Sequence, residues 1–327
     1  MINDALLSRL QSKTFLSIGR AGMDFYPEPP GTEIEDATDF SAHVGGSAGN
    51  IAVALVKLGC EAELLTCFSD DAVGRFTSKK LGQYGVKTTN CRRVGGEARN
   101  TLAVVETRLI DCQSVIYRNG AADFVMDTND IEALNYANSG GVVLSGTALA
   151  DEPSRSAIFA AIDRAREAGA PTIIDMDYRP YSWTSAAEAQ SVYSDAISRC
   201  DVVIGNDVEF GVACGTYDGG FNYATKLVNG TPELVIFKKG ELGSTTLTKT
   251  GTFETGIFAV QALKPTGAGD AFMGGLIAGL ANGMELTQAV IQGSASAAIV
   301  VTRVACSSAM PTQSELTTFL SSHTISL

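Results

Sequence analysis

Residues 264–272 read KPTGAGDAF, and small or apolar residues then continue to position 281. The nearly unbroken run of Ala, Gly, Phe, Met, Leu and Ile over 268–281 predicts a helix that is buried on most sides. Its two leading glycines allow successive backbone N–H groups to turn toward one point, where the positive end of the helix dipole also lies. We therefore expect Gly267, Ala268 and Gly269 to form an anion hole.

Asp270 follows these glycines in the first turn of the expected helix. For an isolated aspartate at such a position, N-terminal capping is the commoner role. A cap does not need flanking glycines, whereas an anion hole does, and a carboxylate beside such a hole can accept the proton of an attacking hydroxyl. We interpret Asp270 as a candidate general base.

Short apolar runs alternate with helical patterns along most of the chain, which favours parallel strands joined by crossover helices. No long linker or internal repeat divides the sequence. This organisation predicts an α/β fold, a three-layer Rossmann-like domain that covers residues 1–327. The expected strands are 14–18, 62–67, 141–144, 172–175, 202–204 and 234–238, and the expected helices are 46–58, 72–84, 154–168, 186–199, 220–228, 268–281 and 289–301.

Two stretches interrupt the alternation. Residues 24–43 are rich in proline and acidic residues, and residues 99–118 contain two β-rich runs, TLAVVET and SVIYR. Pairing of these stretches predicts a small antiparallel sheet that protrudes from the main domain. Such a sheet would suit a lid that closes over substrate and excludes water.

Composition excludes several classes of partner. The net charge of −12, from 24 basic and 36 acidic residues, disfavours nucleic acid and anionic membranes, which bind through clustered Lys and Arg. The sequence shows no secretory signal and no apolar run approaching the ~20 residues of a membrane span. Its seven cysteines contain no C-x-x-C pair and indicate reduced thiols of a cytoplasmic protein.

Common catalytic motifs are also missing. The dipeptide Gly-Lys does not occur, so the P-loop pattern is absent, and no strand leads into G-x-G-x-x-G. His43 and His323 are the only histidines, which excludes histidine triads and H-E-x-x-H zinc sites. Carboxylates and backbone amides must therefore carry any catalysis.

The segment PTGAGDAFMGG at 265–275 closely resembles the C-terminal signature of the pfkB carbohydrate kinase family, which has the ribokinase-like fold. GGSAGNIAVALVKLG at 45–59 resembles the N-terminal signature of the same family, and the likeness extends over essentially the whole chain. The resemblance implies phosphorylation of a sugar hydroxyl by ATP and Mg²⁺. Asp270 would be the base, and the amides of residues 267–269 would hold the charge of the transferred phosphoryl group.

The resemblance also implies a sugar site. Asp24, which ends the segment IGRAGMD, matches the family's acceptor of sugar hydroxyl groups. Gly45, Gly46 and Asn50 match its sugar-binding turn. A homodimer formed through the lid is a further implication of the resemblance.

Further positions match the family's nucleotide side. Asn206 and Glu209, in GNDVEF, match an N-x-x-E motif, in which Glu209 would position Mg²⁺ through water. A helix cap with a solvated acid is the alternative for this pair. Lys239 and the loop from Gly240 to Gly243, in KKGELGS, match the nucleotide-binding loop.

Two arginines suggest an acidic substrate. IYRNGAAD at 116–123 and DMDYRPYSW at 175–183 resemble segments of family members that act on keto-deoxy sugar acids. Arg118 and Arg179 could each offer a planar fork of donors to a carboxylate, although a surface ion pair is the alternative for either. These features predict an ATP-dependent sugar-acid kinase.

The substrate can be narrowed by resemblance. SGTALADEPSR at 145–155 and GSASAAIVVTRVACSSAMPT at 293–312 look like a family member of inositol breakdown, which implies phosphorylation of the 6-hydroxyl of an open-chain keto-deoxy acid. A 2-keto-3-deoxygluconate kinase is the near alternative, mildly disfavoured because Asp177 stands where its pattern has Asn. A neutral-sugar or nucleoside kinase and a catalytically silent sugar-binding regulator also remain open.

Lys264 departs from the family pattern. Many members have an aspartate six residues before the base, where it helps to hold an activating potassium ion. We hypothesise that the Lys264 ammonium substitutes for that ion, so that activity does not require potassium. An exposed loop lysine is the alternative.

Overall fold

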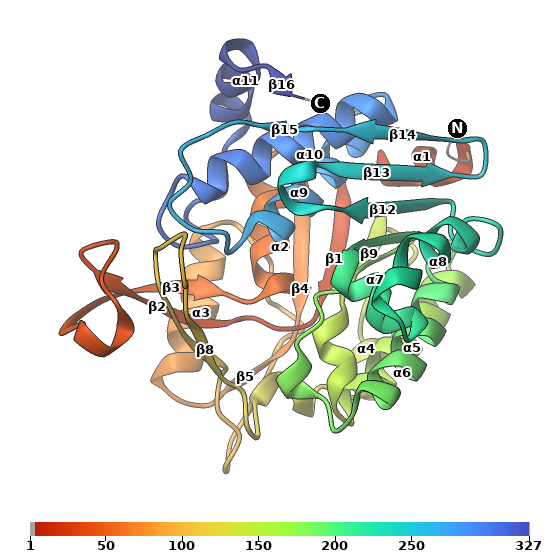
Figure 1. The fold of residues 1–327 in the computed structure, drawn as a ribbon. Helices are drawn as coiled ribbons and strands as arrows, with labels where there is room; N and C mark the ends of the chain where they lie inside the picture. The colour runs from red at the N-terminus through yellow and green to blue at the C-terminus, as the bar shows by residue number, and fades with distance from the viewer. Residues whose placement is uncertain (1–3, 327) are drawn as a thin grey trace.

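The computed structural model describes residues 4–326, in which eight strands form the main sheet in the order β14-β13-β12-β11-β10-β9-β1-β4 (Figure 1). Neighbours from β4 to β12 are parallel, and β13 and β14 extend this sheet in antiparallel fashion. The bounds are β1 Thr14–Ile18, β4 Glu61–Leu65, β9 Gly141–Ser145, β10 Thr172–Asp175, β11 Val202–Asn206, β12 Leu234–Lys238, β13 Ser244–Thr248 and β14 Gly251–Thr255.

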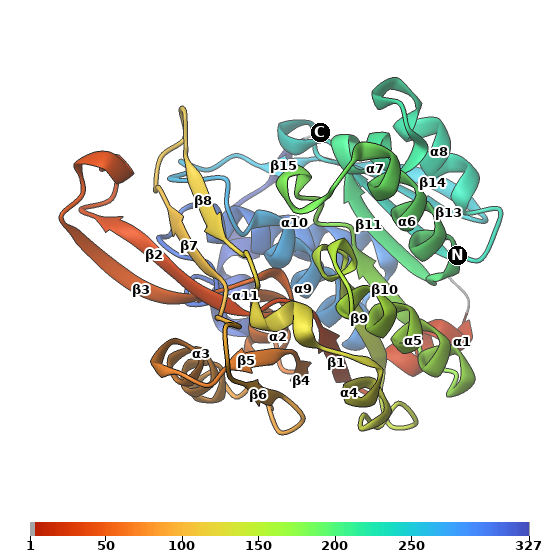
Figure 2. The ribbon, with the colours of Figure 1, turned by 90° about the horizontal axis from the view of Figure 1, so that it is seen from below.

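Helices cover both faces of this sheet (Figures 1 and 2). Alternate strand residues enter different cores: Val143 belongs to the cluster that contains α2, α9 and α10, whereas Val142 belongs to the cluster that contains α5 and α6. Because both faces are buried, the strands read as continuous apolar runs. The predicted three-layer fold is confirmed. The helices are α1 Asp4–Leu10, α2 Ser47–Lys57, α3 Ala72–Gln83, α4 Thr128–Glu132, α5 Ser154–Glu167, α6 Ala186–Arg199, α7 Asp207–Cys214, α8 Gly220–Leu227, α9 Ala268–Ala281, α10 Leu286–Val301 and α11 Gln313–Ser322.

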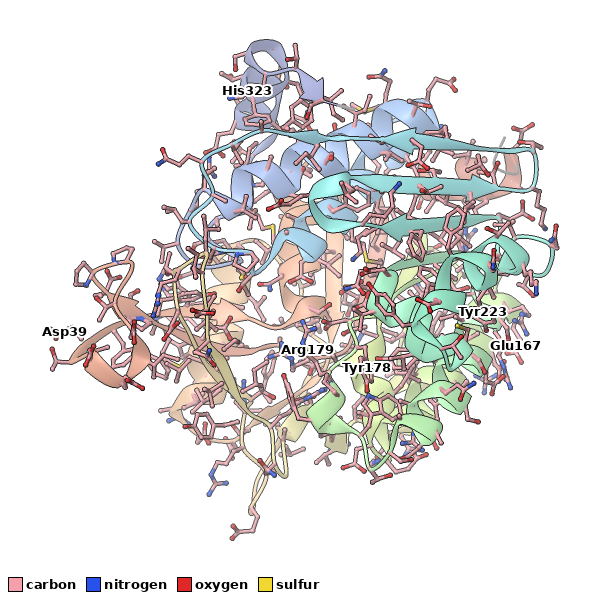
Figure 3. The ribbon with its side chains drawn as sticks, viewed as in Figure 1. Asp39, Glu167, Tyr178, Arg179, Tyr223 and His323 are labelled. Carbon is pink, nitrogen blue, oxygen red and sulfur yellow. The ribbon has the colours of Figure 1, made fainter. Side chains whose placement is uncertain are left out.

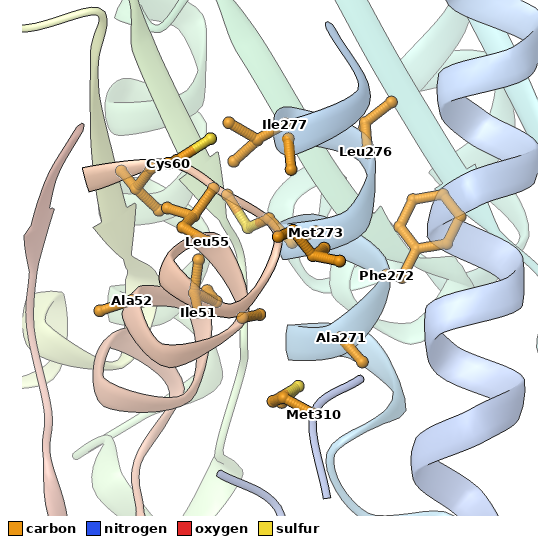
Figure 4. Packing of buried hydrophobic residues seen from close by; sticks show 14 of the residues in the cluster. Ile51, Ala52, Leu55, Cys60, Ala271, Phe272, Met273, Leu276, Ile277 and Met310 are labelled. Atoms are coloured by element: carbon orange, nitrogen blue, oxygen red, sulfur yellow. The ribbon is translucent and has the colours of Figure 1, made fainter. Parts of the chain in front are cut away.

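Helix α9 packs closely against α2. Figure 4 shows Ile51 and Leu55 of α2 facing Met273 of α9, and all three side chains are fully buried. A Cβ on Gly274 would lie 2.4 Å from the Cβ of Ala54, so only glycine permits this approach. The packing fixes the N-terminus of α9 beside the first turn of α2.

A second sheet, the lid sheet, has the strand order β3-β2-β7-β8 and projects from one side of the main body (Figure 2). Its strands are β2 Gly22–Glu28, β3 Asp39–Gly45, β7 Leu102–Val105 and β8 Ser114–Tyr117. The expectation of a wholly antiparallel sheet is wrong, because β2 and β7 are parallel. Each predicted stretch folds into its own antiparallel hairpin, and the hairpins join through their first strands, which run in the same direction.

Two further sheets each contain two strands. The predicted strand 62–67 divides between β4 and β5 (Cys67–Ser69), and β5 pairs with β6 (Arg92–Val94). The other small sheet pairs β15 (Ile257–Phe258) with β16 (Ile325–Ser326). All seven cysteines are unpaired, and no helix in the described part of the chain is long and apolar enough to span a membrane.

Candidate active site

A cavity of about 1130 Å³ lies at the carboxyl ends of the parallel strands, under the lid sheet. This edge of an open α/β sheet is where ligands usually bind. Its walls come from the ends of β10, β11 and β12, from the lid strands and from the start of α9. The cavity therefore joins the segments that the sequence assigned to the sugar side and to the nucleotide side.

The N-terminus of α9 opens into this cavity. Gly267 is the N-cap residue with φ 87°, a left-handed conformation that favours glycine, and a Cβ there would lie 2.8 Å from the Cys306 sulfur. The N-cap residue Gly267 has no side chain with which to cap this end of α9. Residues 267–270 line the cavity, so the first-turn N–H groups are available to an anion.

Asp270 does not cap the helix. Its Oδ2 atom accepts a hydrogen bond of 2.7 Å from Nδ2 of Asn50, and Oδ1 of Asn50 accepts one of 2.6 Å from Ser307. Removal from water raises the pKa of Asp270 to about 6, and nearby Asp177 contributes to the increase. The carboxylate is thus ionised at neutral pH yet basic enough to accept a proton.

Asn50 was predicted in a sugar-binding turn; it lines the cavity, and its side-chain amide also contacts the candidate base. Both ends of its side-chain amide are bonded within the protein, to Asp270 and Ser307. Asn50 lies in the first turn of α2 and is buried. Its amide therefore orients the Asp270 carboxylate.

Asp24 occupies β2 with its side chain directed into the cavity. The residue is buried, its Oδ1 atom has no hydrogen-bond partner within the described residues, and Oδ2 accepts only a long bond of 3.5 Å from Tyr26. Burial raises the pKa of this carboxyl group to about 6. An unpaired buried acceptor is costly, so this position suits a ligand hydroxyl.

Gly45 and Gly46 make room for this arrangement. A Cβ on Gly45 would lie 1.9 Å from a carboxylate oxygen of Asp24. Gly46 has φ 93°, and a Cβ there would lie 2.6 Å from the carbonyl oxygen of Arg20. Both glycines are therefore required by close approach of neighbouring groups.

Asn206 and Glu209 form a capping box at the start of α7. The oxygens of Glu209 accept hydrogen bonds from the backbone of Asn206 (2.7 Å) and Tyr178 (3.1 Å). Residues 4–326 contain no group of three or more His, Cys, Asp or Glu side chains placed to hold a metal ion. Because Mg²⁺ keeps several waters and binds largely through phosphates, this sparse set of oxygens near the cavity fits a hydrated ion.

Lys238, at the end of β12, was missed by the sequence interpretation. Its ammonium lies 3.8 Å from Oδ1 of Asp175 and 3.4 Å from the position that a Cβ on Gly269 would take. Lys239, predicted in the nucleotide-binding loop, pairs with Glu254 at 2.5 Å. Of these two neighbouring lysines, Lys238 is the one whose ammonium lies beside the anion hole.

The loop after β12 contributes glycines to the cavity. Gly240 and Gly243 both line it, as predicted for a nucleotide-binding loop. Gly243 has φ 79°, and a Cβ there would lie 2.1 Å from the carbonyl oxygen of Thr255. This turn therefore requires glycine.

Asp175 and Asp177 were also missed as cavity residues. Asp175 accepts a hydrogen bond of 3.3 Å from Ser47, and burial raises its pKa to about 8. Asp177 has φ 38°, an uncommon conformation for a residue other than glycine, and its Oδ2 atom has no partner among the described residues. Strained and unsatisfied groups of this kind concentrate at functional sites.

Arg118 and Arg179, which were predicted to bind a substrate carboxylate, have different surroundings. Arg118 donates from Nε and Nη2 to Asp123 and from Nη1 to the carbonyl of Thr147, and its guanidinium stacks on Phe124. It is absent from the cavity wall, so the prediction for Arg118 is wrong: its nitrogens are committed to the fold. Arg179 does line the cavity, near the centre of Figure 3, but pairs with Asp177 at 2.6 Å.

Lys264 is not an exposed loop residue. Its side chain is 0% exposed and lines the cavity, and its ammonium donates a hydrogen bond of 2.5 Å to the carbonyl of Thr266. Burial lowers the pKa of Lys264, while Cys306, Asp270 and Asp24 act in the opposite direction. A positive charge is thus placed directly behind the anion hole.

The fold and the cavity together define a carbohydrate kinase. The model of the pfkB family carbohydrate kinases matches residues 12–313, and the chain belongs to this family. The family resemblance and the enzyme class expected from the sequence are confirmed.

Relatives within the family are more specific. The chain is 39% identical over 309 residues to 5-dehydro-2-deoxygluconokinase of Photobacterium profundum, covering 93% of each protein. It is 35% identical over 315 residues to 5-dehydro-2-deoxygluconokinase of Geobacillus kaustophilus, covering 94% of each. Among solved structures, a fructokinase double mutant of Vibrio cholerae with fructose, ADP and potassium ion bound is 25% identical with a TM-score of 0.82, covering 94% of this chain and 98% of that one.

Proposed function

We propose that this chain transfers the γ-phosphoryl group of ATP to the 6-hydroxyl of 5-dehydro-2-deoxygluconate; the names of its relatives support this substrate. The observation that carries the proposal is Asp270, held by Asn50 beside the uncapped start of α9 inside one cavity. A base next to an anion hole is what phosphoryl transfer to an alcohol requires.

In the proposed reaction, the 6-hydroxyl lies between Asp270 and the γ-phosphate. Asp270 accepts the hydroxyl proton, and the amides of residues 267–269 with the Lys238 ammonium stabilise the oxygens of the transferring phosphoryl group. Asp24 accepts a hydrogen bond from a hydroxyl farther along the substrate. Glu209 would hold Mg²⁺ through water, and the bound ion would supply neutralisation of phosphate charge.

The nucleotide occupies the other half of the cavity in this proposal. Gly240 and Gly243 border its phosphates, and Asn206 orients Glu209 through the capping box. The apolar segment Ile257–Phe258 and Ala298 line the same half and suit an adenine ring.

The lid sheet has an exposed apolar surface. Its large exposed side chains are Phe40, Leu109, Ile110, Val115 and Tyr117. We propose that residues 24–43 and 99–118 act as the lid of a single kinase domain spanning 1–327, and that two copies dimerise through this surface. Light scattering should give twice the mass of the 34.2 kDa chain, and Ile110→Asp should give the monomer. A monomeric wild type would contradict the dimer.

The cysteines and charge support a cytoplasmic enzyme without nucleic-acid or membrane partners. Each of the seven thiols is free, and the net charge is −12. These features make a small sugar acid the proposed partner of the site.

A coupled ADP-release assay tests the reaction. The panel contains 5-dehydro-2-deoxygluconate, 2-keto-3-deoxygluconate, fructose and a nucleoside, and we expect the first to have the highest kcat/KM. ³¹P NMR should place the phosphate on O6. A higher kcat/KM for another substrate would reassign the specificity, and substrate binding without ADP release would indicate a silent regulator.

A further inference from the structure

We propose that Arg20 binds the carboxylate of the substrate. This inference rests on the proposed function, because it requires an acidic substrate in the cavity. Arg20 lies in the loop between β1 and β2, at the carboxyl end of β1, and its side chain lines the cavity. The sequence interpretation had nominated two other arginines.

The guanidinium of Arg20 is buried and unpaired. The residue is 7% exposed, and its Nη1 atom has no hydrogen-bond partner within the described residues. Arginine remains protonated in proteins, so the site holds a permanent positive charge. Burial of such a charge without a partner is strongly unfavourable, and an anionic ligand would remove the penalty.

Three neighbouring carboxylates, those of Asp24, Asp123 and Asp270, interact electrostatically with Arg20, but none forms an ion pair with it in the described part of the chain. Asp123 is bonded to Arg118 and Thr101, and Asp270 to Asn50. The buried Oδ1 of Asp24 and Nη1 of Arg20 are therefore both left free in one cavity. A ligand that offers a hydroxyl to one and a carboxylate to the other satisfies both.

The other cations of the cavity are already occupied. Arg179 pairs with Asp177 at 2.6 Å, Lys238 lies 3.8 Å from Asp175, and Lys264 donates to Thr266. Arg20 also interacts electrostatically with Tyr181. Tyr181 belongs to the segment after β10, whereas the nucleotide-binding loop follows β12. Among the described residues that line the cavity, Arg20 is thus the arginine without a protein partner. Its planar fork can receive both oxygens of a carboxylate.

The test compares the keto-deoxy acid with its primary amide, which keeps the shape and removes the charge. Steady-state kcat/KM with ATP and binding by calorimetry without ATP are measured for each. We expect wild type to prefer the acid by about 10²–10³-fold, because loss of one partner of a buried charged pair has effects of this size. In Arg20→Gln the preference should fall to within about threefold of unity.

Two variants make the result interpretable. Arg20→Lys keeps the positive charge but loses the planar pair of donors, so its preference for the acid should lie between those of wild type and Arg20→Gln. This variant also tests the proposal if Arg20→Gln fails to fold. Arg118→Gln is the matched control: it removes a buried arginine that is bonded to Asp123, so it should lower stability while leaving the acid-to-amide ratio unchanged.

The outcomes separate the two proposals. Phosphorylation of the acid with an unchanged ratio in both Arg20 variants would overturn the role of Arg20 and leave the reaction standing. Binding of the acid without phosphorylation would overturn the reaction, and the calorimetric ratio would then decide the role of Arg20. Failure of the acid to bind wild type would overturn both.

Discussion

Replacement of Asp270 by Asn gives the most direct test of the proposed chemistry. The substitution removes the proton acceptor but keeps a side-chain oxygen that can receive the hydrogen bond from Asn50, which is 2.7 Å long in the wild type. General base catalysis contributes about 10²–10⁴-fold in rate, or roughly 3–5 kcal/mol of transition-state stabilisation. We expect kcat to fall by that factor while the dissociation constant for ATP stays within about twofold.

The pH dependence supplies a second readout of the same group. The folded pKa of Asp270 is raised to about 6 from 3.8, so the carboxylate is ionised above pH 6 and becomes protonated as the pH falls through that value. The kcat/KM value, which reports groups of the free enzyme, should therefore be high near neutral pH and decline below it, to about a tenth of its maximum one unit below the pKa. The pKa of Asp24 is also raised to about 6. Because Asp24 binds substrate in the proposal, its protonation should make the decline in kcat/KM steeper.

The assay is coupled ADP release, with kcat taken at saturating ATP and substrate and the pH profile taken as kcat/KM. Asp207→Asn is the control: Asp207 also lies in the first turn of a helix, but its partner is the exposed Tyr217. Its kcat should stay within about twofold of wild type. If Asp270→Asn keeps more than about a tenth of wild-type kcat, or if wild type shows no acid limb near pH 6, Asp270 is not the base.

Three further predictions concern groups around Asp270. Asn50→Leu removes a hydrogen bond that lowers the pKa of Asp270, so the acid limb of the kcat/KM profile should move to higher pH; an unchanged profile would mean that Asn50 does not act on the base. Lys238→Met removes the ammonium beside the anion hole and should lower kcat/KM for ATP by about 10²-fold, whereas Lys239→Met should change it by less than about threefold; equal effects would refute the assignment. Lys264 places a buried charge behind the anion hole, so initial rates in sodium-only and potassium buffers should agree within about twofold, and a large potassium requirement would refute the substitution hypothesis.

The fold was largely predictable because its parallel strands are buried on both faces. Val142 and Val143 enter opposite cores, so β9 appears in the sequence as a continuous apolar run. The strands β13 and β14 were not predicted, because Ser244–Thr248 is rich in Thr and lacks an apolar pattern although every residue of it is buried. Its burial depends on neighbours elsewhere in the chain.

The candidate site was predictable where its residues are contiguous. Gly267, Ala268, Gly269 and Asp270 occupy one stretch, so their spacing alone indicated the chemistry, and α9 begins at Ala268 as expected. Roles that depend on distant partners could not be predicted in this way. Nothing in the segment IYRNGAAD shows that Arg118 is bonded to Asp123 and Thr147.

The same limit applies to the cations that were missed. Arg20 follows β1 and Lys238 ends β12, and both line the cavity because the main sheet brings the carboxyl ends of its parallel strands to one edge. The sequence does not show which of the adjacent residues Lys238 and Lys239 faces the cavity. Residue type identified the candidates, whereas tertiary contacts determined which cation is free and which is paired.

The buried polar atoms of the cavity that lack hydrogen-bond partners indicate where a ligand would supply those partners. Buried polar atoms without partners occur on Arg20, Asp24 and Asp177, which all line one cavity. Each such atom costs about 1–3 kcal/mol when no partner is supplied. The three atoms carry one positive and two negative charges, and a sugar acid offers the matching set, a carboxylate and several hydroxyl groups. In the proposal, a neutral sugar can offer hydroxyl groups to the two carboxylates and to the arginine but no charge to pair with the guanidinium, so we expect the cavity to favour the acid.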